Sequence, residues 1–209
     1  MWTKKKLAKE LSKLEGFKNP KPWLEQYMTD SETASFMLWN AYMLGDVEGK
    51  TILDLGSGTG VLGIGALLLG ADKVVFIDID EEAINVLKQN LKAISIPPEK
   101  YEIIKADVTK EDFLINHLNI DVVVQNPPFG IQKHGMDVKF LTTSLNIASV
   151  VYSLHDSASL SFLKALQDKL GFRITHHWSV QLMLKQTMKF HKARVKRIQA
   201  VMLRLQKNA

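Results

Sequence analysis

The chain has 209 residues, of which 46% are apolar and 23% charged, a length and balance typical of one globular domain spanning residues 1–209. It contains no cysteine, which excludes disulfides and cysteine-based zinc or iron–sulfur sites, and its six histidines show no ligand spacing, so we expect no metal. There is no run of eighteen apolar residues and no secretory leader, so we expect no membrane association and a cytoplasmic location.

The net charge of +5 is unevenly distributed. Residues 1–21 carry seven lysines against two acids, and residues 22–168 carry ten bases against twenty acids. Residues 169–209 carry ten bases and no acid. A basic block is either solvated surface or a contact for a polyanion. Two basic ends around an acidic middle favour a nucleic-acid surface formed by the termini.

The predicted elements begin with helical spacing at residues 4–14 and 31–44, which indicates an N-terminal helical extension over residues 1–45. A cofactor-binding core is expected over residues 50–155, because short apolar strands there take turns with helical periods. The predicted strands of this core are 50–55, 73–79, 101–106, 120–125 and 149–155, and its helices lie near 60–69, 81–93 and 137–147.

A C-terminal unit is expected over residues 156–209. It comprises a helix near 157–170 and a hairpin of two strands, 172–180 and 197–205, joined by a basic connection. The alternation of strand and helix along the chain predicts an α/β fold whose parallel sheet is covered on both faces.

The first predicted strand leads into DLGSGTGVLGIG, residues 54–65. Glycines at a strand-to-helix turn let backbone N–H groups approach a ligand. Gly58, Gly60 and Gly63 satisfy the dinucleotide pattern G-x-G-x-x-G, and Asp78 follows at the spacing of a ribose acceptor. A dinucleotide-dependent dehydrogenase is therefore one alternative. Asp54 argues against it, because a carboxylate directly before the glycines repels a pyrophosphate and suits a ligand with a cationic end.

S-adenosylmethionine is such a ligand, since it carries a sulfonium and an ammonium group but no phosphate. The loop would pass under its methionine and ribose, Asp78 would accept from the ribose hydroxyls, and Asp107 would approach the adenine amino group. Either aspartate alone could simply cap a turn. Their joint position at successive carboxyl ends of parallel strands, where open sheets bind ligands, favours the cofactor role.

The fourth predicted strand ends in QNPPFG, residues 125–130, at the same edge. An Asn-Pro pair commonly forms only a turn. With Phe129 next, the rigid turn also holds the Asn126 side-chain oxygen and the Pro127 carbonyl beside an aromatic face. These oxygens can accept hydrogen bonds from an exocyclic amine and aim its lone pair at a methyl group, while Phe129 stacks on the base. A planar base must leave its stack to reach this site, so we expect a single-stranded, looped-out or flipped substrate.

These motifs together resemble a known family. DLGSGTG with NPPF is similar to class I S-adenosylmethionine-dependent amino-methyltransferases, and EQYMT, FIDIDEEA, VYSLH and KFHK resemble methyltransferase-like protein 5 and its archaeal relatives over almost the whole chain. The resemblance implies a Rossmann-like fold with a seven-stranded, mostly parallel sheet and an antiparallel last strand. It also implies N6-methylation of an adenosine in small-subunit ribosomal RNA, with a small zinc-containing activator protein as partner in the eukaryotic members.

By motif, the resemblance assigns roles to individual residues. It makes Asn126, Pro127, Pro128 and Phe129 the catalytic tetrad, and it places Gln26 and Thr29 over the cofactor beside Gly56, Thr59, Val61, Asp78, Asp107 and Val108. With Asp54, Gly58 and Gly60 of the glycine loop, these are the expected cofactor-binding residues. Trp23 and Tyr27 could also line the pocket, although aromatic residues at that spacing are more often core.

The basic segment 189–197 is expected to clamp RNA near the pocket rather than to be a solvated connector. The residues expected to bind RNA are Lys189, His191, Lys192, Arg194, Lys196 and Arg197.

Three alternatives of function remain open. A protein glutamine N5-methyltransferase also carries NPP followed by an aromatic residue, and the basic ends argue only weakly against it. A DNA adenine methyltransferase is disfavoured, because no separate target-recognition domain fits into 209 residues. A nucleic-acid-binding module without activity is the alternative from another class.

The third predicted strand, residues 101–106, is expected at an edge of the sheet. An edge strand can be a template for strand addition by a partner, or a solvated edge protected by Lys100, Glu102 and Lys105. The sequence leaves these two interpretations balanced.

Overall fold

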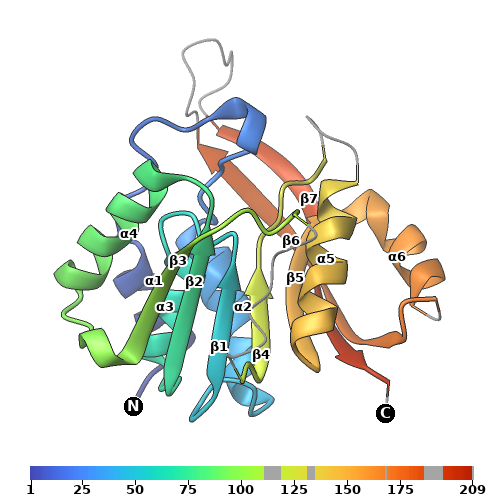
Figure 1. Cartoon of the computed structure of the whole chain (residues 1–209), viewed down its shortest axis with the longest axis horizontal. Helices are drawn as coiled ribbons and strands as arrows, with labels where there is room; N and C mark the ends of the chain where they lie inside the picture. Colours follow the sequence, from blue (N-terminus) through green and yellow to red (C-terminus); the bar gives the residue numbers. More distant parts are fainter. Residues whose placement is uncertain (111–118, 131–134, 168, 186–194, 209) are drawn as a thin grey trace.

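The computed structural model is built around a seven-stranded sheet in the order β3-β2-β1-β4-β5-β7-β6 (Figure 1). The strands from β1 to β5 run parallel, whereas β7 is antiparallel to both β5 and β6, which confirms the predicted sheet. The structure describes residues 1–110, 119–130, 135–167, 169–185 and 195–208. The strands are β1 Thr51–Leu55, β2 Lys73–Asp78, β3 Tyr101–Lys105, β4 Val122–Gln125, β5 Val150–Asp156, β6 Phe172–Lys185 and β7 Val195–Lys207.

Helices cover both faces of this sheet. Apolar residues of α1 to α4 pack on one face, and those of α5 and α6 on the other. The helices are α1 Lys4–Leu11, α2 Ser31–Met43, α3 Val61–Leu68, α4 Glu81–Ala93, α5 Met136–Ile147 and α6 Leu160–Leu166, with 3-10 turns η1 Pro22–Leu24, η2 Pro98–Lys100 and η3 Ser157–Ser159. None of the described helices is long and apolar enough to span a membrane.

The apolar strands are explained by burial on both faces. In β2, Val74 and Phe76 belong to the core under α1 to α4, while Val75 and Ile77 belong to the core under α5 and α6. A strand buried on both sides needs apolar residues at every position, so its sequence is a continuous apolar run and does not alternate. The core therefore fixes the register that brings the carboxyl ends of β1 to β4 to one edge.

The segment between α1 and α2 crosses over this edge, and both termini lie at the opposite end of the molecule (Figure 1). Its entry is held by Asn90 of α4, whose side-chain oxygen accepts from the Glu15 N–H at 2.8 Å. The Asn90 amide nitrogen donates to the carbonyl oxygens of Glu15, at 3.0 Å, and Thr59, at 2.9 Å. One buried amide thus joins the N-terminal segment, α4 and the glycine loop.

Strands β6 and β7 are longer than the sequence pattern predicts. Their antiparallel pairing continues to Lys185 opposite Val195, whereas the pairing of β7 with β5 ends at Ala200 opposite Asp156. The ribbon therefore continues beyond the end of its pairing with β5. Leu182 is buried in this part of the ribbon, and Ile198 packs against the same core.

Candidate active site

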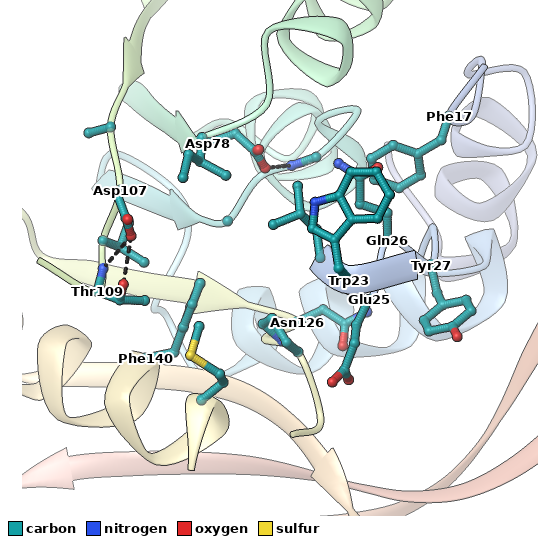
Figure 2. Close-up of a pocket in the computed structure, with 18 residues that line it drawn as sticks. Phe17, Trp23, Glu25, Gln26, Tyr27, Asp78, Asp107, Thr109, Asn126 and Phe140 are labelled. Atoms are coloured by element: carbon teal, nitrogen blue, oxygen red, sulfur yellow. Dashed lines mark hydrogen bonds between the residues drawn. The ribbon is translucent and has the colours of Figure 1, made fainter. Parts of the chain in front are cut away.

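A cavity of about 330 Å³ opens at the carboxyl edge of β1 to β4, under the N-terminal segment (Figure 2). Three of its lining residues are acids, Glu25, Asp78 and Asp107, and none of the described lining residues is Lys or Arg. The other lining residues are Phe17, Trp23, Leu24, Gln26, Tyr27, Gly56, Gly58, Ile79, Ala106, Val108, Thr109, Asn126, Pro128, Met136 and Phe140.

The glycine loop contributes Gly56 and Gly58 to this wall, and both need the absence of a side chain. Gly58 has φ +54°, and a Cβ there would lie 2.7 Å from Cζ of Phe17. Gly56 has φ +71°, and a Cβ there would lie 2.9 Å from Cε1 of Phe140. The two phenyl rings pack directly on the loop backbone from opposite sides of the cavity.

Asp54 lies beneath the loop and does not line the cavity. Its carboxylate is 2% exposed and accepts from the Gly63 N–H at 2.7 Å, inside the first turn of α3. Burial raises the pKa of Asp54 to about 7, against the opposing hydrogen bond from Gly63, and the nearby charge of Asp78 adds to the rise. Asp54 therefore supports the glycine loop from beneath and does not make the expected contact with a cationic ligand.

The remaining predicted residues of the glycine loop are likewise buried and lie outside the cavity lining, so the loop divides into a lining part and a supporting part. The supporting residues besides Asp54 are Thr59, Gly60 and Val61.

Asp78 and Asp107 both cap turns and both line the cavity. Asp78 accepts from the Gly58 N–H at 2.7 Å and from the Asp80 N–H at 2.8 Å. Burial raises the pKa of the Asp78 carboxyl, and these two backbone hydrogen bonds oppose the rise. Asp107 accepts from the backbone N–H and the hydroxyl of Thr109 at 3.0 and 2.7 Å (Figure 2). Turn capping and a place in the wall are therefore compatible for both residues.

Gln26 holds the N-terminal segment against α4. Its amide nitrogen donates to Asp80 at 2.7 Å, and its amide oxygen accepts from the Lys21 N–H at 2.8 Å. Lys21 also pairs with Asp80 through its side chain at 2.5 Å. Although burial opposes it, the hydrogen bonds from Gln26 and Lys21 hold the pKa of the Asp80 carboxyl below its ordinary value. The N-terminal segment, which forms the roof of the cavity, is therefore joined to the start of α4 through the Asp80 carboxylate.

Asn126 follows β4, and its amide nitrogen donates to the Thr29 hydroxyl at 2.9 Å. Thr29 is 5% exposed and does not line the cavity, so the structure places it on Asn126 and not over the cofactor position expected for it. Asn126 and Pro128 line the large cavity. Pro127 and Phe129 line a smaller adjacent hollow, which is completed by residues of the β6–β7 ribbon, Leu182 and Ile198.

A buried polar chain lies next to Asn126 in the sheet. The Gln125 amide nitrogen donates to the Ser153 hydroxyl at 2.9 Å, and that hydroxyl lies 2.8 Å from Nε2 of His155. Nδ1 of His155 is 3.8 Å from the Asp137 carboxylate in the first turn of α5. Serine and histidine of the VYSLH motif thus connect β4, β5 and α5, the helix that supplies Met136 and Phe140 to the wall.

Trp23 and Tyr27 both line the cavity, which is the less common of the two positions considered for them. Trp23 is 68% exposed and Tyr27 is partly buried, so neither is a core residue. Three other lining residues, Glu25, Phe17 and Phe140, are not predicted from the sequence. Glu25 stands inside the EQYMT motif directly before Gln26, which was the one available signal. Phe17 and Phe140 had none, because each reaches the cavity only through the folding of distant segments onto the loop.

Most of the residues expected to bind RNA lie outside the described part of the chain: Lys189, His191, Lys192 and Arg194. Lys196 belongs to β7, and its side chain is also outside the description. Arg197 is exposed near the start of β7. Within the described residues there is no group of three or more His, Cys, Asp or Glu side chains placed to hold a metal ion.

The sequence and fold are similar to those of several known proteins. Residues 28–167 match the family model described as conserved hypothetical protein 95. The uncharacterized protein MJ0284 of Methanocaldococcus jannaschii is 38% identical over 99% of this chain and 95% of its own length. The rRNA N(6)-adenosine-methyltransferase METTL5 of Danio rerio is 32% identical over 96% of this chain and 97% of its own length.

The crystal structure of PH1948 from Pyrococcus horikoshii, which is named as a candidate RNA methyltransferase, is similar along the full length of both chains, with 41% identity and a TM-score of 0.90. The fold is thus the Rossmann-like fold of class I methyltransferases, and the dehydrogenase alternative is wrong. Similarity of this extent over nearly the whole length of each protein identifies the chain as a member of the METTL5 family of rRNA N6-adenosine methyltransferases.

Proposed function

We propose that this protein transfers a methyl group from S-adenosylmethionine to N6 of an adenosine in RNA, most specifically in small-subunit ribosomal RNA. The observation that carries the proposal is the position of Asn126, which lines both the large cavity and the smaller hollow. Its amide nitrogen donates a hydrogen bond to the Thr29 hydroxyl. The full-length similarity to METTL5 proteins supports the same activity.

The cavity fits S-adenosylmethionine by its charge. Three acids and no Lys or Arg among the described lining residues favour a ligand with cationic groups and disfavour a pyrophosphate. The bound cofactor would supply a methyl group activated by its positively charged sulfur.

The residues proposed to hold the cofactor come from the sheet edge and the roof. Gly56 and Gly58 offer close approach to the backbone, Asp78 and Asp107 offer carboxylates after β2 and β3, and Gln26 faces the cavity from the N-terminal segment. The other residues of the expected set, namely Thr29, Asp54, Thr59, Gly60, Val61 and Val108, are proposed to support or complete this pocket.

The chemistry proposed for the NPPF turn is positioning. Because the Asn126 nitrogen donates to Thr29, its amide oxygen is the atom presented to an amine. The Pro127 carbonyl would accept the second N–H, so that the nitrogen lone pair is aimed at the methyl group. Phe129, in the wall of the smaller hollow, would stack on the adenine ring. Pro127 and Pro128 restrict the turn and so keep these acceptors in place.

RNA recognition is proposed for the β6–β7 ribbon. Residues 169–209 carry ten bases and no acid, and Arg197 is exposed in β7. Two residues of the same ribbon, Leu182 and Ile198, line the hollow beside Phe129. A strand of RNA held by the ribbon would therefore lead directly to the target position, with phosphate contacts that supply affinity independent of sequence.

A small zinc-containing activator protein remains a proposed partner, and β3 is the surface proposed for it. β3 is an edge strand, which can pair with an added strand. Its flanking charges are engaged within the chain, since Lys100 pairs with Asp72 and Lys105 with Glu81. A partner strand would have to accommodate these ion pairs.

The test is transfer of a labelled methyl group to ribosomal subunits, naked RNA, DNA and release factor in parallel. We expect label in N6-methyladenosine of small-subunit RNA, whereas label only in protein would support the glutamine methyltransferase and reject the proposal. Asn126→Ala should abolish transfer and leave cofactor affinity within about twofold, because its amide acts on the amine. Unchanged turnover would show that the tetrapeptide has been assigned wrongly.

A further inference from the structure

Glu25 lies with Asn126 at the boundary between the two cavities. Three of the described lining residues, Glu25, Tyr27 and Asn126, are shared by the large cavity and the smaller hollow. Figure 2 shows Glu25 and Asn126 in the same part of the wall, on the side of the N-terminal segment. In the proposed function the cofactor fills the large cavity and the target adenine lies against Phe129 at the hollow, which at about 30 Å³ is smaller than the base. The boundary is then where the reacting nitrogen and the methyl group meet.

The backbone holds Glu25 in an uncommon conformation. Its φ of 50° and ψ of 43° lie in the left-handed region, which costs free energy for a residue other than glycine. The surrounding turn maintains it, because the Glu25 N–H donates to the Pro22 carbonyl and the Glu25 carbonyl accepts from Tyr27, both at 3.0 Å. The next residue, Gln26, is anchored to Asp80. Strain kept between anchored neighbours in a cavity wall indicates a functional position.

The other two carboxylates of the wall are differently placed. Asp78 and Asp107 line the large cavity and are not among the described residues that line the hollow. Glu25 is therefore the carboxylate, among the described lining residues, that borders the expected position of the target amine.

The reaction needs a group of this kind. Methylation forms an N–C bond with the lone pair of the amine, while the C–S bond of the donor breaks and leaves its electron pair on sulfur. The nitrogen then carries a positive charge and one proton too many, so an N–H bond must break and leave its electrons on nitrogen. The amide oxygens of Asn126 and Pro127 orient the amine but are too weakly basic to keep that proton, whereas a carboxylate can accept it.

We propose that Glu25 is a further catalytic residue, whose carboxylate stabilises the positive charge that develops on the target nitrogen and accepts the proton that leaves it. This inference rests on the proposed function. It assigns to the N-terminal segment a chemical role in addition to that of a roof. Glu25 is partly buried, and a carboxylate partly removed from solvent acts on a developing charge more strongly than a fully hydrated one.

The test is Glu25→Gln, which keeps the size of the side chain and removes its charge. We expect the single-turnover rate of adenosine methylation in RNA to fall about 100-fold, the lower end of what a positioned acid–base group contributes. By calorimetry, the affinities for S-adenosylmethionine and for S-adenosylhomocysteine, which lacks the positive sulfur, should both stay within about twofold. Glu25→Asp, which keeps a carboxylate and tolerates the left-handed backbone, should recover part of the rate.

The matched control is Glu48→Gln, an exposed glutamate before β1, which should react like the wild type. An unchanged rate for Glu25→Gln would overturn the inference and leave the proposed function standing. Weaker binding of S-adenosylmethionine with unchanged binding of S-adenosylhomocysteine would assign Glu25 to the sulfonium and also overturn it. A wild-type protein that methylates no adenosine in RNA would overturn both proposals, so the failures are distinguishable.

Discussion

The two walls of the cavity are built in different ways. In the sheet-edge wall, carboxylates hold nearby backbone amides, as Asp54 holds Gly63 nine residues later and Asp78 holds Gly58 twenty residues earlier. In the N-terminal wall, side chains hold each other across the chain, as Gln26 holds Asp80 over 54 residues and Thr29 holds Asn126 over 97. The contacts of the sheet-edge wall join residues within about twenty positions of each other, whereas those of the N-terminal wall join residues that only the fold brings together.

The difference indicates that the two walls contribute differently to stability and to function. Buried amide–carboxylate contacts form together with the parallel sheet and cannot open without disrupting it. The N-terminal wall is joined through a few side-chain hydrogen bonds and has an exposed Trp23 at its rim. We expect the sheet edge to carry the stability of the protein and the N-terminal wall to carry the precision of the site.

The largest effect is expected from the carboxyl group of Asp54, which is buried beneath the sheet-edge wall. The pKa of Asp54 is raised from 3.8 to about 7 by burial, so the folded state binds a proton that the unfolded state releases between these values. Stability conferred by the protonated form is complete below about pH 4 and is lost as the pH rises through about 7. The free energy of unfolding of wild type minus that of Asp54→Asn should fall over this range by on the order of 4 kcal/mol.

Urea denaturation at a series of pH values measures this difference, and carboxylates common to both proteins cancel in it. Asp72→Asn, which removes a carboxylate that is exposed on the surface, is the control, and a fall of this size should be specific to Asp54→Asn. A flat difference for Asp54→Asn would mean that the carboxylate is not desolvated as the structure indicates.

The next effect concerns the packing under the same wall. Gly60 has φ +89°, and a Cβ there would lie 2.2 Å from Cδ1 of the buried Leu87. Gly60→Ala should lower the free energy of unfolding by about 3 kcal/mol, from backbone strain together with overpacking. Gly49→Ala is a matched control, because Gly49 has φ +69° with nothing near its missing Cβ. It should cost about 1 kcal/mol, and an equal loss for both variants would assign the whole effect to strain.

The same contrast explains how far the sequence could predict this protein. The strands, the glycine turn and Asp78 follow from local patterns, since apolar runs, glycine spacing and strand ends are readable within about twenty residues. The positions of Thr29 and Phe17 are not readable in this way, because each depends on a partner brought close by the fold. The sequence predicts a role for Asp54 but places its carboxylate on the ligand, because a pattern of residue types does not show which way a buried carboxylate points.

A smaller effect is expected from loosening the N-terminal wall. Gln26→Ala removes the donor to the buried Asp80 and should lower the free energy of unfolding by about 1.5 kcal/mol. Hydrogen exchange of the backbone amides of residues 21–29 should rise by roughly tenfold, while that of β1 and β2 changes less. Gln89→Ala is the control, since Gln89 reaches the same segment through an exposed bond to Lys18. Equal exchange in both walls would show that they open as one unit.

The smallest effect on the folded protein is expected from a substitution of Thr29, which should change the rate of the reaction alone. Thr29→Val keeps the shape of the side chain and removes the hydroxyl that accepts from the Asn126 amide at 2.9 Å. The amide then loses its fixed orientation, and the turnover of RNA adenosine methylation should fall about tenfold, which corresponds to about 1.4 kcal/mol. Affinity for S-adenosylhomocysteine should stay the same, because Thr29 does not line the cavity. Thr29→Ser keeps the hydroxyl and should retain most of the rate. Equal losses in both variants would show that Thr29 contributes only through packing, and would contradict the idea that the N-terminal wall sets the precision of the site.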